Sequence, residues 1–153
     1  MKFESSRFGA IEVDEEKILH FPRGLPGFSG CTEFIVMDHD KETPLKWLQC
    51  VDRPEVAFLV VEPEQILLSY GLEIPEPVLA FLGWQKETGD PRDVVVFVIL
   101  TVDGENLTAN LRAPVLVNLE NRRAHQMILD DPQIPIQYPI RPEPAKKAEA
   151  PAG

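Results

Sequence analysis

The stretch Asn110–Asn118 constrains the fold more than any other part of the sequence. It follows the most apolar run of the chain, Val94–Val102, across the short polar link 103–106. Apolar and polar residues alternate over Leu107–Ala113, which is the pattern of a half-buried strand. Pro114 has no N–H to donate to a sheet ladder, so the strand is expected to bend or to lie at an edge there. The sequence therefore predicts a long hairpin around which a sheet is built.

Short apolar runs separated by frequent turns make up most of the remaining chain. Proline accounts for 15 of 153 residues, about double the usual frequency, which favours turns over long helices. One short helix is predicted over Pro75–Gly83, because proline is tolerated in a first turn and glycine can end a helix. With one helix, parallel βαβ units are excluded, and an antiparallel sandwich or barrel is expected. Further extended segments are predicted at residues 2–4, 9–13, 17–21, 33–37, 45–51, 56–61, 65–70 and 124–129.

The length of the chain fits a single domain with a substantial core. Four of the last 15 residues are proline, so residues 1–138 are predicted to form the domain and residues 139–153 a disordered tail. The N-terminus has no apolar segment of the kind that signal peptides carry. No run of about 20 apolar residues is present either, so we expect a cytoplasmic protein without a membrane span.

The net charge limits the partners that the chain can bind. Fifteen Lys and Arg residues stand against 25 Asp and Glu residues, which gives a net charge of −10. Such a field repels phosphate backbones, so direct binding of nucleic acid is not expected. The excess of acids suits a basic partner, but it also serves solubility alone.

One span concentrates this negative charge. Residues 54–85 contain no Lys, Arg or His but include Glu55, Glu62, Glu64, Glu73 and Glu76. The sequence thus predicts an uncompensated negative field over this acidic span. Tyr70 and Trp84, aromatics of a kind enriched at binding hot spots, lie in the same span. Two interpretations fit this span equally well. It is an interface for a basic partner, or it is a solvated edge whose two aromatic residues lie in the core.

Motifs for catalysis or metal binding do not stand out from the sequence. His20, Cys31, His39 and Cys50 contain no closely spaced pair of the kind that structural zinc sites use. No Ser lies in a GxSxG elbow. The loop Pro22–Phe28 is rich in glycine and proline but lacks the phosphate-binding patterns. We therefore predict no enzyme, no cofactor and no metal site, and we expect the cysteines to be reduced and partly buried.

Several short motifs, taken together and in order, resemble those of the flagellar assembly factor FliW family. They are Phe8-Gly9 with Ile11-Glu-Val13, Gly24-Leu-Pro-Gly-Phe28 after a Phe-Pro, Asn110-Leu-Arg-Ala-Pro-Val-Leu-Val-Asn118, and Gln126-Met-Ile-Leu129. The resemblance implies a mainly β fold, a small antiparallel β-barrel-like single domain with one short helix, without enzymatic activity. It also implies a cytoplasmic protein that binds flagellin and the RNA-binding translational regulator CsrA. Such a protein antagonises CsrA allosterically, without occupying its RNA site, so that flagellin translation follows flagellin secretion.

Two groups of residues are candidates for partner binding by a monomer. Glu62, Glu64, Tyr70 and Glu73 of the acidic span are expected to face the basic regulator. Thr108, Asn110, Arg112 and Asn118 form a polar face for a partner or for barrel closure. The asparagines fit an architectural role near Pro114 at least as well. Two alternatives for function stay open: a flagellin chaperone without a regulatory role, and a small-ligand-binding barrel.

Overall fold

The alternation seen in the sequence produces strands through most of the chain. The computed structural model describes residues 2–5, 9–28, 30–38, 43–67, 70 and 72–140. The strands are β1 (Lys2–Ser5), β2 (Gly9–Glu12), β3 (Leu19–His20), β4 (Glu33–Asp38), β5 (Lys46–Cys50), β6 (Ala57–Val61), β7 (Val94–Asp103), β8 (Asn106–Asn118), β9 (Arg123–Gln126) and β10 (Tyr138–Ile140). The helical segments are α1 (Glu76–Phe81) and three 3-10 turns, η1 (Glu15–Lys17), η2 (Pro63–Gln65) and η3 (Pro91–Asp93).

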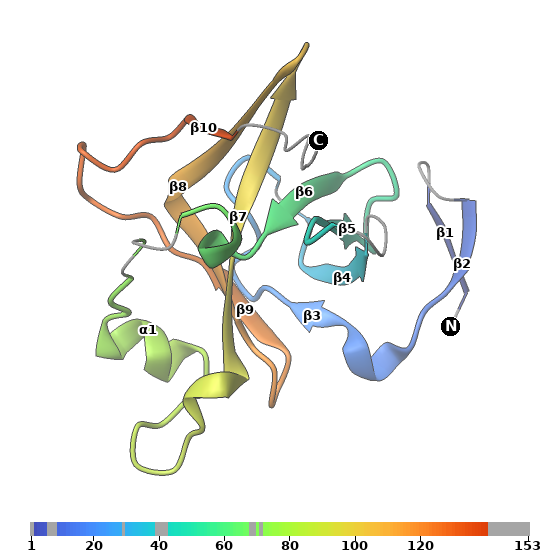
Figure 1. Cartoon of the computed structure of the whole chain (residues 1–153). Helices are drawn as coiled ribbons and strands as arrows, with labels where there is room; N and C mark the ends of the chain where they lie inside the picture. Colours follow the sequence, from blue (N-terminus) through green and yellow to red (C-terminus); the bar gives the residue numbers. More distant parts are fainter. Residues whose placement is uncertain are drawn as a thin grey trace.

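Seven of these strands close into a barrel. The sheet runs β10-β8-β7-β6-β5-β4-β3-β9, and β9 pairs back onto β8, which closes the ring. The pairings are antiparallel except that of β3 with β9, which is parallel. The β7–β8 hairpin is its longest element, β10 extends the sheet beside β8, and β1 with β2 forms a separate two-stranded sheet (Figure 1). The predicted mainly β fold with one short α-helix is confirmed.

Side chains fill the interior of the barrel. Every strand of the ring contributes to one apolar cluster, the barrel core, which is possible only for the face that points inward. Phe34 is fully buried there, and the centre of its ring lies 5.0 Å from the centre of the Phe21 ring in an edge-to-face arrangement. The buried members of the cluster are Leu19, Phe21, Leu25, Cys31, Phe34, Leu48, Cys50, Val56, Val60, Phe97, Val115, Val117 and Ala124.

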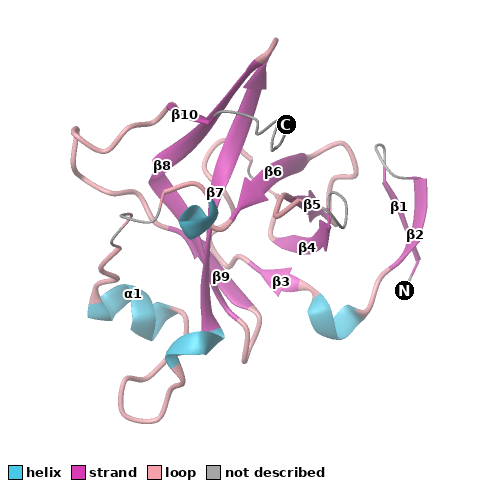
Figure 2. Ribbon diagram, in the orientation of Figure 1, coloured by secondary structure: helices cyan, strands magenta, loops and turns pink. Residues whose placement is uncertain are grey.

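Three smaller apolar clusters cover parts of the outer face of the barrel, where the helical segments lie (Figure 2). Val78 of helix α1 and Leu82, which caps its C-terminal end, pack on Leu116 of β8. The segment after η2 and the chain around Ile134 pack on Val98 and the neighbouring outward residues of β6 to β8. The residues around η1 pack on β4. None of the helices in the described part of the chain is long and apolar enough to cross a membrane.

Some predicted elements differ from the observed ones at their ends. The extended segment predicted at 65–70 is wrong at its start, because Gln65 belongs to η2 and the Leu67 N–H turns back to the Pro63 carbonyl. The last predicted strand is shorter than expected, since β9 ends at Gln126. Beyond residue 138, Pro139 and Ile140 pair with β8, and residues 141–153 lie outside the described residues.

The bend predicted at Pro114 is a large irregularity in the β7–β8 ladder. Phe97 pairs with Val115, but Ile99 already pairs with Asn110, so residues 111–114 of β8 face Val98 alone. This bulged segment turns toward the chain that follows β9: the Leu129 N–H donates to the Arg112 carbonyl and the Met127 N–H to the Pro114 carbonyl. The proline therefore lies where β8 changes partners, as its missing N–H requires.

Candidate functional site

Glu62 and Glu64 form an acidic pair at the end of β6. Glu62 precedes η2, and Pro63 between the two glutamates is buried, which fixes the turn that carries them. Burial raises the pKa of the Glu62 carboxyl, and the hydrogen bond and charge of Glu64 raise it further. The two carboxyl groups are therefore adjacent, and together they concentrate negative charge that a cation would relieve.

The acidic span is less isolated from cations than its sequence predicts, and the expectation of an uncompensated field is wrong at two of its five acids. The Arg53 guanidinium lies 3.0 Å from the Glu55 carboxylate. The charge of Lys46 lowers the pKa of Glu62, against the larger effects that raise it. Arg53 directly precedes the span in sequence. Lys46 lies eight residues before it, and the antiparallel pairing of β5 with β6 places Lys46 beside the end of β6.

Tyr70 is an anchor for its loop. Its hydroxyl donates a hydrogen bond of 2.8 Å to the carbonyl of Leu111, and its ring packs on the outer face of β6 to β8. Burial raises the pKa of this phenol. The acidic span thus packs beside the bulge of β8. Trp84 is also held internally, since its indole N–H donates to the Asp90 carbonyl at 3.0 Å.

Glu73 is exposed on the segment that leads into α1. Its neighbours Leu72 and Ile74 pack against the cluster beneath the helix, which leaves Glu73 pointing away from that cluster. Among the described residues it has no ion pair or side-chain hydrogen bond. The structure therefore brings Glu62 and Glu64 together, while Glu73 contributes charge from a separate segment.

Asn110 and Arg112 hold the bulge of β8. The Asn110 side-chain oxygen accepts from the Arg112 N–H at 3.0 Å, a local contact that stabilises the bend. The Arg112 side chain donates to the carbonyls of Ile134 and Pro132, both at 2.8 Å. These contacts bind the chain after β9 to the barrel, so both residues have the architectural role that the sequence left open.

Asn118 ties helix α1 to the barrel. It is fully buried, its amide donates to the Leu82 carbonyl at 2.9 Å, and its oxygen accepts from the Glu120 N–H at 3.0 Å. Asn121 donates to the same carbonyl at 2.9 Å. Gly83 has a left-handed backbone with φ of 78°, and a Cβ at this position would lie 2.6 Å from the Asn121 amide nitrogen. The left-handed backbone at the end of α1 therefore favours glycine beside this asparagine pair.

Replacing Asn118 by alanine is expected to lower the free energy of unfolding by about 2 kcal/mol, because it leaves the Glu120 N–H without its acceptor and removes one donor to the Leu82 carbonyl. Urea unfolding followed by circular dichroism measures this change. Asn106→Ala, at an exposed position on the same strand, is the matched control and should change stability little. Equal stability of the two variants would contradict the conclusion that Asn118 holds the end of α1 on the barrel.

Sequence reasoning missed a hollow of about 270 Å³ at one mouth of the barrel. Its floor consists of inward side chains of the barrel core, such as Val95 and Val117. Its rim carries Lys17, Lys46, Glu62 and Arg122. Part of this hollow could have been predicted from the sequence. Lys46 and Glu62 continue the alternation of inward residues on β5 and β6, so their side chains are expected at the end of the barrel rather than on its outer face.

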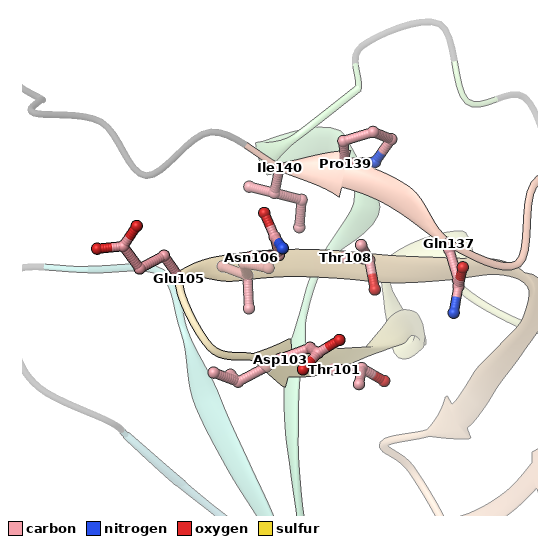
Figure 3. A pocket seen from close by; sticks show the side chains of 10 residues that line it. Thr101, Asp103, Glu105, Asn106, Thr108, Gln137, Pro139 and Ile140 are labelled. Atoms are coloured by element: carbon pink, nitrogen blue, oxygen red, sulfur yellow. The ribbon is translucent and has the colours of Figure 1, made fainter.

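A second hollow, of about 670 Å³, lies along the tip of the β7–β8 hairpin and β10 (Figure 3). Thr108 lines it and pairs across the sheet with Thr101 and with Pro139, which also line it. Threonine, carboxylate and amide side chains line this hollow. Thr108 of the predicted polar face thus lies here, apart from Asn118 at the other end of β8.

The sulfur and histidine groups singled out in the sequence do not converge. Cys31 and Cys50 are free and buried, and burial is the main cause that raises the pKa of the Cys50 thiol to about 12. His39 lies outside the described residues. Within the described ranges, no group of three or more His, Cys, Asp or Glu side chains could hold a metal ion.

The closed ring of strands, its filled interior and the charged groups at its mouth and outer face define the class of the protein: a small antiparallel β-barrel with surface sites. The chain belongs to the FliW family, because the family model described as FliW protein matches residues 2–140.

Relatives and a solved structure agree with this assignment. The chain is 36% identical to the flagellar assembly factor FliW of Caldanaerobacter subterraneus subsp. tengcongensis, over 94% of this chain and 95% of that protein. It is also 36% identical to the FliW of Carboxydothermus hydrogenoformans, over 100% and 97% of the two chains. A crystal structure of the flagellar assembly factor FliW superimposes with a TM-score of 0.81 at 30% identity, covering 93% of this chain and 98% of that chain.

Proposed function

We propose that this chain is a flagellar assembly factor that binds two proteins, flagellin and the RNA-binding regulator CsrA, in the cytoplasm. Binding of the chain antagonises CsrA allosterically, without occupying its RNA site, and so couples flagellin translation to flagellin secretion. Membership of the FliW family supports the role in flagellar assembly. The chain works as a binding protein without catalysis in this proposal.

The acidic pair is the observation that supports a binding site for CsrA at the end of β6. An RNA-binding protein presents a basic surface, and complementary charge speeds and orients such encounters. Glu62 and Glu64 are adjacent, and their mutual repulsion falls when a cation approaches. Exposed Glu73 adds charge to the acidic span, while Tyr70 holds the loop between them in place through Leu111. Asn110, Arg112 and Asn118 support the partner surface from beneath by fixing β8 and α1.

The packed interior argues against the small-ligand alternative. Ligand sites of drug size occupy about 300–1,000 Å³ and enclose most of the ligand. Here phenylalanine, leucine and valine side chains fill the barrel, and the hollow at its mouth measures about 270 Å³. The hollow of about 670 Å³ lies outside the barrel core, along the tip of the β7–β8 hairpin and β10. The remaining alternative is a flagellin chaperone without a regulatory role. Such a chaperone would bind flagellin but not CsrA.

Titration calorimetry with each partner separately tests the proposal. The purified chain should bind CsrA and should also bind flagellin, and CsrA bound to the chain should show weakened affinity for its RNA while the RNA site stays accessible to crosslinking. Binding of flagellin without binding of CsrA would reduce the function to that of a chaperone. Binding of neither protein would overturn the proposal.

A further inference from the structure

A cationic aromatic cluster lies at the C-terminal end of α1, beside the apolar contacts of the helix, because His125 pairs with Leu116 in the β8–β9 ladder. The guanidinium carbon of Arg23 lies 4.5 Å from the centre of the Phe81 ring, and that of Arg123 lies 4.7 Å from the same centre. The His125 ring meets Phe81 edge-on at 5.1 Å. We call these four residues the Phe81 cluster. They come from the loop after β3, from α1 and from β9, three segments far apart in sequence.

The fold holds each member of the Phe81 cluster in place. Phe81 ends α1, and the next carbonyl, that of Leu82, is fixed by the two asparagines already described. Arg23 lies in the turn in which the Gly24 N–H donates to the Phe21 carbonyl at 2.8 Å. Arg123 and His125 lie on β9, two residues apart and thus on one face of the strand. The arrangement is therefore set before any ligand arrives.

The two guanidinium groups of the cluster have no counter-ion in the part of the chain that the structure describes. Among the described residues, neither Arg23 nor Arg123 forms an ion pair or a side-chain hydrogen bond, and the Nε of Arg123 is buried without an acceptor. By contrast, Arg53 pairs with Glu55 and Arg92 with Asp90. Two unpaired arginines on one ring are unusual in a chain with a net charge of −10.

This positive charge acts on its surroundings. The pKa of His125 is lowered, first by burial and second by the charge of Arg23. The charge of Arg23 therefore reaches the imidazole on the other side of the Phe81 ring. The guanidinium groups thus lie over an aromatic ring, while their N–H donors, which match carboxylates in geometry, have no acceptor among the described residues.

We propose that the Phe81 cluster binds an acidic segment of a protein partner, with carboxylates on Arg23 and Arg123 and an apolar side chain near Phe81. The cluster is a surface feature, since Arg23 is exposed and Phe81, Arg123 and His125 are partly exposed. A surface spread over three segments suits an extended peptide better than a small ion. Because salt screens charges beyond about 8–10 Å, a bound carboxylate interacts most strongly with the guanidinium groups that it contacts. The proposal does not depend on the acidic pair.

Nuclear magnetic resonance on the full chain tests this site with a defined probe. The probe is a blocked peptide of alternating glutamate and leucine, and its control is the same peptide with glutamine in place of glutamate. The glutamate peptide should shift the Nε–Hε signals of Arg23 and Arg123, while those of paired Arg53 and Arg92 stay in place. The glutamine peptide should shift none of these signals.

Variants with matched charge separate a specific site from general attraction. R23Q/R123Q should weaken binding of the glutamate peptide about tenfold or more, since each lost contact is a hydrogen bond between charged groups. R53Q/R92Q removes the same charge elsewhere and should leave the affinity within about twofold. Single R23Q, at an exposed loop position, keeps the test valid if the double variant unfolds. Equal losses in both pairs, no binding, or equal binding of the glutamine peptide would overturn the proposal.

Discussion

Phe34→Ala is expected to lower the free energy of unfolding by about 3–5 kcal/mol, enough to remove a large part of the stability of a domain of this size. Phe34 is fully buried in the barrel core, where the centre of its ring lies 5.0 Å from that of Phe21 and 6.3 Å from that of Phe58. Alanine leaves a cavity between strands that the closed ring cannot easily collapse. The loss therefore includes both the transfer of the ring and the unfilled space.

Urea unfolding followed by fluorescence and circular dichroism measures this loss. Val102→Ala is the control, because Val102 is 63% exposed at the tip of the β7–β8 hairpin. The control variant should unfold within about 0.5 kcal/mol of the wild type. A loss below about 1 kcal/mol for Phe34→Ala would mean that the barrel interior is not packed as described.

The hairpin was predictable because its signals are local. Alternation and a single proline predict strands at 94–102 and 107–118, and the structure has β7 and β8 at Val94–Asp103 and Asn106–Asn118. The parallel pairing of β3 with β9 that closes the barrel was not predictable from residue patterns. It joins His20 to Arg123 through a single pair of residues, and such distant contacts leave no periodic signal.

The candidate site was predictable only in part, for the same reason. Charge counting found the acidic pair, because Glu62 and Glu64 are neighbours in sequence. It could not find Lys46 beside them, since that contact depends on the pairing of β5 with β6. Asn118 contacts Leu82, a residue far away in the chain, and the Phe81 cluster joins three separate segments. Sequence therefore located the charged residues but not the tertiary contacts that give them roles.

E62K/E64K is expected to weaken binding of CsrA about a hundredfold, because two attractive charges become two repulsive ones facing a basic surface. The reversal also places the new lysines beside Lys46, so that the barrel mouth becomes more positive. The variant should fold like the wild type, since Glu64 is exposed and Glu62 partly exposed. Flagellin binding should persist if flagellin uses a different surface.

The control for this reversal is E15K/E16K. These two glutamates are adjacent and exposed in η1, so the variant changes the net charge by the same amount without replacing a residue that lines the barrel mouth. A general effect of net charge would weaken CsrA binding equally in both variants. A site at the acidic pair predicts that E15K/E16K stays within about threefold of the wild type.

Titration calorimetry of CsrA with the wild type, E62K/E64K and E15K/E16K, at about 50 and about 300 mM salt, tests the central claim most directly. The account predicts that affinity for the wild type and for E15K/E16K falls as salt rises. It also predicts that E62K/E64K binds far more weakly and with little dependence on salt. Unchanged affinity and salt dependence in E62K/E64K would contradict the claim that the acidic pair binds the regulator.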